Sequence, residues 1–228
     1  MILGAAASVG LIHTILGPDH YIPFIAISKA RSWSREKTMI VTFLCGIGHV
    51  GSSVVLGLIG LFFGFAVFHL EGMESFRGDL AAWLLIMFGL AYTVWGVRKA
   101  LSSRRHTHGH RHSGIAHSHG HSHMGGHSHI HGSEASITPW ILFTIFVFGP
   151  CEPLIPLVMY PAAQGDLPLA ASAAFAFSAA TIAAMMTIVF FLSAGMAKVQ
   201  IKALEPWSHA LAGLTILLCG VGIRFLGL

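Results

Sequence analysis

The sequence predicts an all-α membrane protein with six transmembrane helices. They form two inverted three-helix repeats, whose first and fourth helices are broken at Gly-Pro. Composition is the first observation: 54% of the 228 residues are hydrophobic and 10% are charged, with a mean hydropathy of +0.73. Because a soluble domain carries about 25% charged residues, this shortage favours a membrane protein. The other observations are a series of apolar stretches and a proline motif in each half.

The apolar stretches define the expected spans. A transmembrane helix needs about 20 mostly apolar residues, and residues 39–68 and 168–197 exceed that length without one Asp, Glu or Arg. The six expected spans cover residues 1–28, 39–68, 80–97, 139–163, 168–196 and 208–228. Proline cannot donate a backbone hydrogen bond and its ring clashes with the preceding turn. Gly17-Pro18 and Gly149-Pro150 should therefore break the first and fourth spans.

Basic residues indicate how the spans are oriented. Most Lys and Arg residues lie in the first, third and fifth loops, whereas the second and fourth loops are acidic. The basic residues of those three loops are Lys29, Arg31, Arg35, Lys37, Arg98, Lys99, Arg104, Arg105, Arg111, Lys198 and Lys202. The positive-inside rule makes these loops cytoplasmic and places both termini outside. This predicts a multi-pass protein of the cytoplasmic membrane whose basic residues do not serve nucleic-acid binding.

Two similar motifs indicate an internal repeat. GPDHYIP at residues 17–23 and GPCEPLIP at residues 149–156 contain the only Gly-Pro and Ile-Pro dipeptides in the chain. Because each repeat has three spans, the two copies must run in opposite orientations, as in many transporters. The chain then divides into a first repeat at residues 1–97, a His-rich cytoplasmic loop at 98–138 and a second repeat at 139–228.

The loop between the repeats is rich in histidine. Eleven of the 26 residues from His106 to His131 are histidine, interleaved with Gly and Ser. Such a segment has little to bury, so we expect disorder. Neutral imidazoles suit Zn, Cu, Ni and Co, which predicts metal binding by the loop. Its histidines are His106, His108, His110, His112, His117, His119, His121, His123, His127, His129 and His131.

Polar residues inside the first span are candidate metal ligands, because ionisable groups within a membrane are costly and need a role. His13 and His20 lie seven residues apart, about 10.5 Å along a continuous helix, which is too far for one ion. A break at Gly17-Pro18 lets His13 turn toward Asp19 and His20. The helix should therefore open where the candidate ligands lie.

Further candidates lie in the second and fourth spans. Small neighbours surround His49, so its helix can pack closely and bring the imidazole to the first-span site; the alternative is a buried histidine bonded to a backbone carbonyl. Glu152 is the only acidic residue of spans four to six. It is a candidate metal ligand, proton carrier or partner of a protonated histidine, and Cys151 beside it is a lesser candidate ligand. We expect Glu74 in a solvated outer loop.

These residues carry a family resemblance. GLIHTILGPDH followed one span later by GHVGSSVVLG resembles the nickel/cobalt transporter group of NiCoT permeases, NicO/RcnA-type exporters and UreH-like urease accessory membrane proteins. The resemblance implies that His13, Asp19, His20 and His49 handle metal. GPCEPLIP resembles DsbD-type disulfide carriers and sulfite exporters, which share a three-plus-three design. The chain departs from the NiCoT pattern by one extra residue between the first two histidines and by six spans instead of eight.

The expected function is secondary transport of nickel or cobalt ions, with zinc a further candidate. Ligating imidazoles must be neutral, so metal and protons compete, which offers a route to proton coupling. The cytoplasmic His loop could collect ions for export or store imported ions, and export is slightly favoured. We expect no enzyme activity and no cofactor. The expected partners are a divalent metal ion and membrane lipid, and a homo-oligomer is left open. The alternatives are a sulfite-type small-anion exporter, a nickel-delivery accessory protein for urease, and a thiol-disulfide electron carrier, which a single motif cysteine disfavours.

Overall fold

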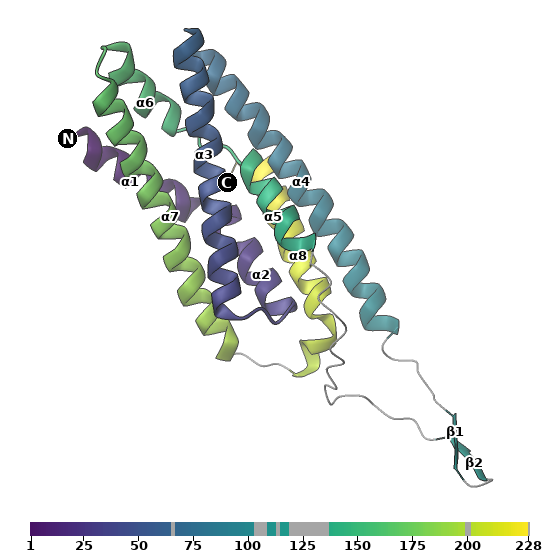
Figure 1. The fold of residues 1–228 in the computed structure, drawn as a ribbon. Helices are drawn as coiled ribbons and strands as arrows, with labels where there is room; N and C mark the ends of the chain where they lie inside the picture. Colours follow the sequence, from purple (N-terminus) through teal and green to yellow (C-terminus); the bar gives the residue numbers. More distant parts are fainter. Residues whose placement is uncertain (65–66, 103–108, 113–114, 119–136, 199–201, 228) are drawn as a thin grey trace.

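The structure, a computed structural model, is helical apart from one small hairpin (Figure 1). It describes residues 1–64, 67–102, 109–112, 115–118, 137–198 and 202–227. The α-helices are α1 Ile2–Leu16, α2 Ile22–Ala30, α3 Arg35–Phe63, α4 Val67–Ser102, α5 Ile137–Phe148, α6 Leu154–Ala163, α7 Leu167–Lys198 and α8 Ser208–Val221. The shorter elements are the 3-10 helices η1 Pro18–His20 and η2 Lys202–Trp207, the π-helix η3 Gly222–Leu226, and the strands β1 Gly109–His112 and β2 Ile115–Ser118.

Four helical segments are long and apolar enough to cross a membrane, which identifies a multi-pass membrane protein. These segments are Arg35–Phe63, His69–Ser102, Leu167–Met196 and Leu204–Leu226. The pair formed by α1 and the segment Pro18–Ala30 adds a fifth if it is counted as one bent span. Helices α5 and α6 are shorter apolar segments. Large apolar side chains such as Phe62, Phe76 and Phe175 lie exposed on the surface, as lipid contact requires.

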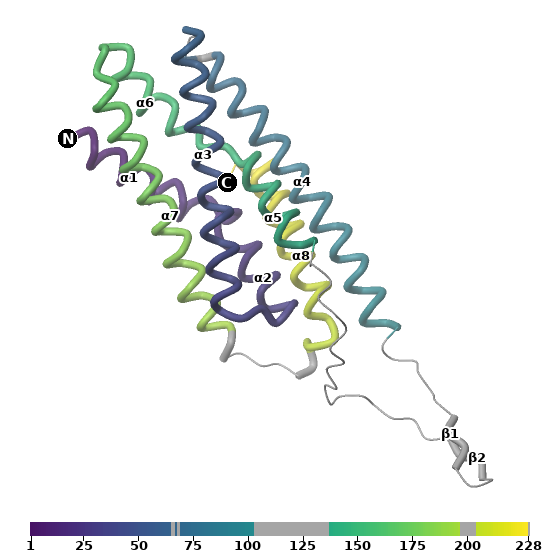
Figure 2. The backbone as a smooth tube through the Cα atoms, in the orientation of Figure 1, coloured from purple at the N-terminus to yellow at the C-terminus, as the bar shows by residue number. Residues whose placement is uncertain are grey.

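Both Gly-Pro positions interrupt a helix. Helix α1 ends at Leu16, Gly17 is extended, and the chain bends by 84° before it continues through η1 and α2 (Figure 2). Helix α5 likewise ends one residue before Gly149, and α6 begins only after Pro153. In each case proline follows the last helical residues, where its ring and missing N–H prevent the helix from continuing. The predicted breaks are therefore present.

The expected loop between the second and third spans is absent. The chain turns at Gly64, which adopts the left-handed φ of 66° that ends α3, and α4 begins at Val67. No proline occurs between Gly64 and Ser102, so α4 continues through the segment expected to be an acidic loop. The expectation of a solvated Glu74 is wrong, because its side chain is fully buried on this helix.

The long helices pack in pairs. Helix α4 lies along α8, and α3 along α7, while α1 packs on α7 and α5 packs on α3 (Figure 1). The close approach of α4 and α8 depends on glycine: a Cβ at Gly89 would meet the backbone of Leu217, and one at Gly213 would meet Thr93. The ends of α2, α4 and α7 lie toward one end of the bundle, together with the start of α8.

Part of the His-rich loop forms an antiparallel hairpin rather than the expected irregular segment. Strands β1 and β2 pair with His110 opposite His117. Two residues, Ser113 and Gly114, separate the strands in sequence, the length of the commonest hairpin connections. Hydrogen bonds between the two backbones account for the hairpin without an apolar core. Most of the remaining loop histidines lie outside the described residues.

Candidate metal centre

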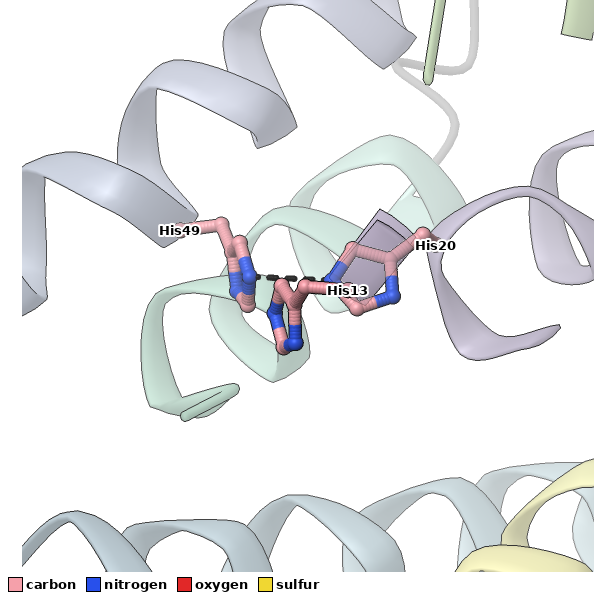
Figure 3. Close-up of side chains that lie close together, drawn as sticks. All are labelled: His13, His20 and His49. Atoms are coloured by element: carbon pink, nitrogen blue, oxygen red, sulfur yellow. Dashed lines mark hydrogen bonds between the residues drawn. The ribbon is translucent and has the colours of Figure 1, made fainter. Parts of the chain in front are cut away.

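Three histidines from three different helices meet inside the bundle (Figure 3). His13 lies on α1, His20 on η1 and His49 on α3, and one nitrogen of each lies within 4.8 Å of the others. The ring centroids of His13 and His20 are 4.7 Å apart, and those of His20 and His49 are 4.8 Å apart. His20 and His49 are 2% and 1% exposed. The arrangement offers three imidazole nitrogens to one ion.

Glycine at both helix breaks makes room for this cluster. A Cβ at Gly17 would collide with Nδ1 of His20 and would lie 2.9 Å from Oδ1 of Asp19. A Cβ at Gly149 would lie 2.7 Å from Nδ1 of His49. The glycine of each Gly-Pro dipeptide therefore allows an imidazole to approach the backbone at a helix break.

Hydrogen bonds fix the tautomers of two rings. His20 Nδ1 lies 3.0 Å from the carbonyl oxygen of Gly17 and 3.0 Å from Oδ1 of Asp19, and His49 Nδ1 lies 3.3 Å from the carbonyl oxygen of Phe146. These partners only accept hydrogen bonds, so we assign an N–H to each Nδ1. Each Nε2 then carries a lone pair unless its ring is protonated, as is usual in histidines that bind metal.

The two free nitrogens face each other. His20 Nε2 and His49 Nε2 lie 3.1 Å apart, and two lone pairs at that distance repel unless a cation lies between them. Two imidazole nitrogens bound to one tetrahedral metal ion at 2.0–2.1 Å lie about 3.3 Å apart. The observed spacing therefore suits a bound metal ion, and it also suits a shared proton.

His13 completes the nitrogen set. Its Nε2 is buried and has no hydrogen-bond partner within the described part of the chain. An unsatisfied buried polar atom costs about 1–3 kcal/mol, so this nitrogen is free to bind an ion in the cluster. It is an observation independent of the His20–His49 contact.

Cys151 lies closer to the cluster than the sequence indicated. Its side chain is fully buried, and its Sγ lies 3.0 Å from Nε2 of His49. The sulfur therefore contacts His49, while the group of mutually close ligand atoms consists of the three histidines alone. Imidazole and thiolate are both ligands that zinc and related transition metals accept. The other two cysteines, Cys45 and Cys219, are also free and buried, so a disulfide carrier has no second motif thiol.

The two acidic candidates occupy different places. Asp19 accepts a hydrogen bond from His20 rather than joining the three nitrogens, and its side chain is 22% exposed. Glu152 is exposed and lies outside the cluster. In the turn before α6, the side chain of Cys151 is buried and that of its neighbour Glu152 is exposed. The structure therefore brings Cys151, and not Glu152, into contact with His49.

A cavity of about 380 Å³ reaches the cluster. The first break lines it with His13, Asp19 and His20, and the second break lines it with Pro150 and Pro153. The partly exposed carboxylate of Asp19 gives this cavity a negative group beside the imidazoles. The cavity therefore gives access to His13 and His20 of the nitrogen cluster.

The loop histidines stand apart from this centre. His110, His112 and His117 belong to the hairpin. The others, His106, His108, His119, His121, His123, His127, His129 and His131, lie outside the described residues. Metal binding by the loop therefore stays a prediction from the sequence.

Sequence reasoning missed two residues near the centre. Glu74 and Arg77 form an ion pair on α4, and Glu74 accepts a hydrogen bond from the backbone N–H of Cys151 at 2.9 Å. The only signal was an opposite-charge pair three residues apart, in a segment that also contains Glu71 and Asp79.

Comparison with known proteins gives no relative: no protein-family model, curated protein or solved structure matches the chain.

Proposed function

We propose that this protein is a secondary transporter of divalent transition-metal ions, nickel or cobalt with zinc a further candidate, in the cytoplasmic membrane. The observation that carries the proposal is the cluster of His13, His20 and His49, whose nitrogens converge inside a membrane protein. Ionisable groups within a membrane typically mark an ion pathway. Imidazoles select transition metals over calcium and magnesium, which prefer oxygen ligands.

The proposal includes six spans in two inverted repeats. Helix lengths support it, because α1, α2 and α3 of 15, 9 and 29 residues correspond to α5, α6 and α7 of 12, 10 and 32 residues. Packing supports it too: α1 lies on α7 while its counterpart α5 lies on α3, and α4 pairs with its own counterpart α8. The ligand cluster then lies where the two broken helices meet, as in many transporters.

Transport would proceed by exchange of a metal ion and protons at the same lone pairs. The ion enters past Asp19, which also holds the Nδ1–H of His20, and binds where the two Nε2 atoms face each other. Rocking of one repeat against the other then opens the site to the opposite side. The His-rich loop, placed in the cytoplasm by its basic surroundings, would collect metal there, which favours export.

Flux measurements in proteoliposomes test the proposal and separate it from its alternatives. Purified protein should carry nickel, cobalt or zinc ions across the bilayer and should not carry sulfite. An accessory protein that only delivers nickel would bind the metal without flux. Failure to transport any of the three metals would contradict the proposal.

Asp19→Ala should reduce metal flux. Removing the carboxylate leaves the Nδ1–H of His20 held only by the carbonyl of Gly17, and loss of a group that orients a ligand costs about 10–100-fold in affinity. The Michaelis constant for cobalt flux measures this effect. Glu152→Ala, which changes an exposed carboxylate outside the cluster, is the matched control and should transport normally; equal loss in both variants would count against a specific role for Asp19.

Metal binding should weaken as the pH falls. Protonation occupies the Nε2 lone pairs of His20 and His49, so stability of the metal complex is lost on acidification and gained as the pH rises. Each proton displaced by the metal changes the affinity by about tenfold per pH unit. Cobalt titrations at several pH values measure the slope, and a pH-sensitive dye inside proteoliposomes should record proton movement opposite to the metal. Binding that is independent of pH would refute proton exchange.

A further inference from the structure

Glu74 and Arg77 form a buried ion pair on α4, next to the segment that carries Cys151. The side chain of Glu74 is fully buried and that of Arg77, one turn later, is 16% exposed. Charges placed within a membrane are costly and are retained where they have specific partners. Replacing a buried pair by apolar residues is often neutral or stabilising, so stability alone is a weak explanation for these two residues.

The pair binds both ends of the second helix break. Arg77 Nη2 donates to the carbonyl oxygens of Val147 at 2.7 Å and Gly149 at 3.3 Å, at the end of α5. Glu74 Oε2 accepts the N–H of Cys151, which leads into α6. A helix end leaves carbonyls that favour a cation, and a helix start leaves N–H groups that favour an anion. The positive charge therefore lies at the carbonyl end of α5, and the negative charge binds a backbone N–H in the segment between α5 and α6.

The first break is stabilised differently. There the carbonyl oxygen of Gly17 accepts a hydrogen bond from His20 Nδ1, a group of the metal centre itself. At the second break the corresponding carbonyl, that of Gly149, is bound by Arg77 from a separate helix. Cys151, two residues later, is thereby positioned from outside the proposed site.

The same pair also binds the turn of α3 that follows His49. Arg77 donates to Ser52 Oγ at 2.6 Å and to Ser53 Oγ at 3.2 Å, and Ser53 Oγ donates to Glu74 at 3.1 Å. Ser52 Oγ in turn donates to the carbonyl oxygen of His49 at 2.7 Å. Glu74 and Arg77 therefore connect the element that carries His49 to the element that carries Cys151.

We propose that Glu74 and Arg77 are positioning residues that hold Cys151 Sγ against His49, so that an ion bound by the three histidines takes a thiolate as its fourth ligand. This inference rests on the proposed function and specifies its substrate class, ions that accept both nitrogen and sulfur. When the metal–sulfur bond forms, the thiol proton of Cys151 is released to solvent, and no atom changes oxidation state. Sulfur ligation disfavours the hard cations magnesium, calcium and manganese.

Cobalt absorption spectroscopy tests this inference on the full-length protein in detergent. A thiolate bound to Co²⁺ produces a ligand-to-metal charge-transfer band in the near ultraviolet, which bound histidines of the loop do not produce. Wild type should show the band and Cys151→Ser should lose it. Glu74→Gln should weaken the charge-transfer band and lower the affinity for the cobalt ion that produces this band by about tenfold. Arg77→Lys keeps the positive charge, so its band and its cobalt affinity should decrease less.

The matched control is Thr42→Val. Thr42 is buried on the same helix as His49 and bonds only within that helix, to the carbonyl oxygen of Thr38. Its variant should retain the full band. If Glu74→Gln does not fold, the double variant Ser52→Ala with Ser53→Ala keeps the ion pair, removes its links to α3 and should show the same loss.

The outcomes separate this inference from the proposed function. An undiminished band in Glu74→Gln, or in the serine double variant where Glu74→Gln does not fold, would overturn the positioning role. Wild-type cobalt binding that depends on His13, His20 and His49 but shows no thiolate band would overturn sulfur ligation and leave the proposed function standing. Cobalt binding that is unchanged when those three histidines are replaced would instead overturn the proposed function.

Discussion

We expect His49→Gln to fold and to reduce metal flux by at least about 100-fold, the upper end of what loss of a ligand's partner costs. Glutamine has nearly the length of histidine and can donate to the carbonyl oxygen of Phe146, which His49 contacts at 3.3 Å. It cannot replace the Nε2 lone pair that faces His20. Initial rates of nickel or cobalt flux in proteoliposomes measure the loss, and Tm checks the fold.

His69→Gln is the matched control for this variant. His69 also lies on a long apolar helix but belongs to no cluster of candidate ligands among the described residues. Its replacement should leave the flux unchanged. Normal flux in His49→Gln would remove His49 from the site and leave only two imidazoles, too few for the proposed centre.

We expect Gly149→Ala to lower metal affinity by at least about tenfold, comparable to loss of a group that orients a ligand. The added Cβ would lie 2.7 Å from Nδ1 and 3.1 Å from Cε1 of His49, and 3.1 Å from the carbonyl oxygen of Phe146. Since these atoms form the hydrogen bond that fixes the ring, the imidazole must turn away from the cluster. Cobalt titration measures the affinity.

Gly51→Ala provides the contrast, because it makes the same chemical change two residues from His49. A Cβ there meets nothing within 4 Å, and alanine in a helix is favoured over glycine by about 1 kcal/mol. Its cobalt affinity should match wild type, with an unchanged or higher Tm. Equal loss of affinity in both variants would show that the effect reflects helix propensity or general damage rather than the approach of His49 to the break.

The first-span part of the site was predictable because local chemistry determines it. Gly17-Pro18 must interrupt a helix, and the interruption lies between His13 and His20, so their approach follows from sequence spacing. The small residues around His49 gave a similar indication for α3. Neither argument required knowledge of the distant half of the chain.

The second-half part of the site was not predictable in the same way. Cys151 and Glu152 lie in an irregular segment with three nearby prolines, where no helical or strand period indicates which side chain faces inward. Only the tertiary contact with Glu74 explains why the backbone of Cys151 faces α4. Periodicity arguments apply to regular elements and fail at the breaks where this site is built.

The length of α4 was also misjudged for a physical reason. Charged residues between apolar stretches normally indicate a loop, so Glu74 was expected in a solvated outer loop. In the structure Glu74 and Arg77 are paired with each other and with the broken helix. Hydrogen bonds from another part of the chain, which sequence alone does not show, allow these charges to be buried.

Anomalous diffraction at the metal absorption edge, from crystals of the full-length protein grown with nickel or cobalt, tests the central claim most directly. The account predicts a peak within coordination distance of His13, of Nε2 of His20 and of Nε2 of His49, and no such peak in His49→Gln. Metal peaks confined to the His-rich loop, with none among these three rings, would contradict it.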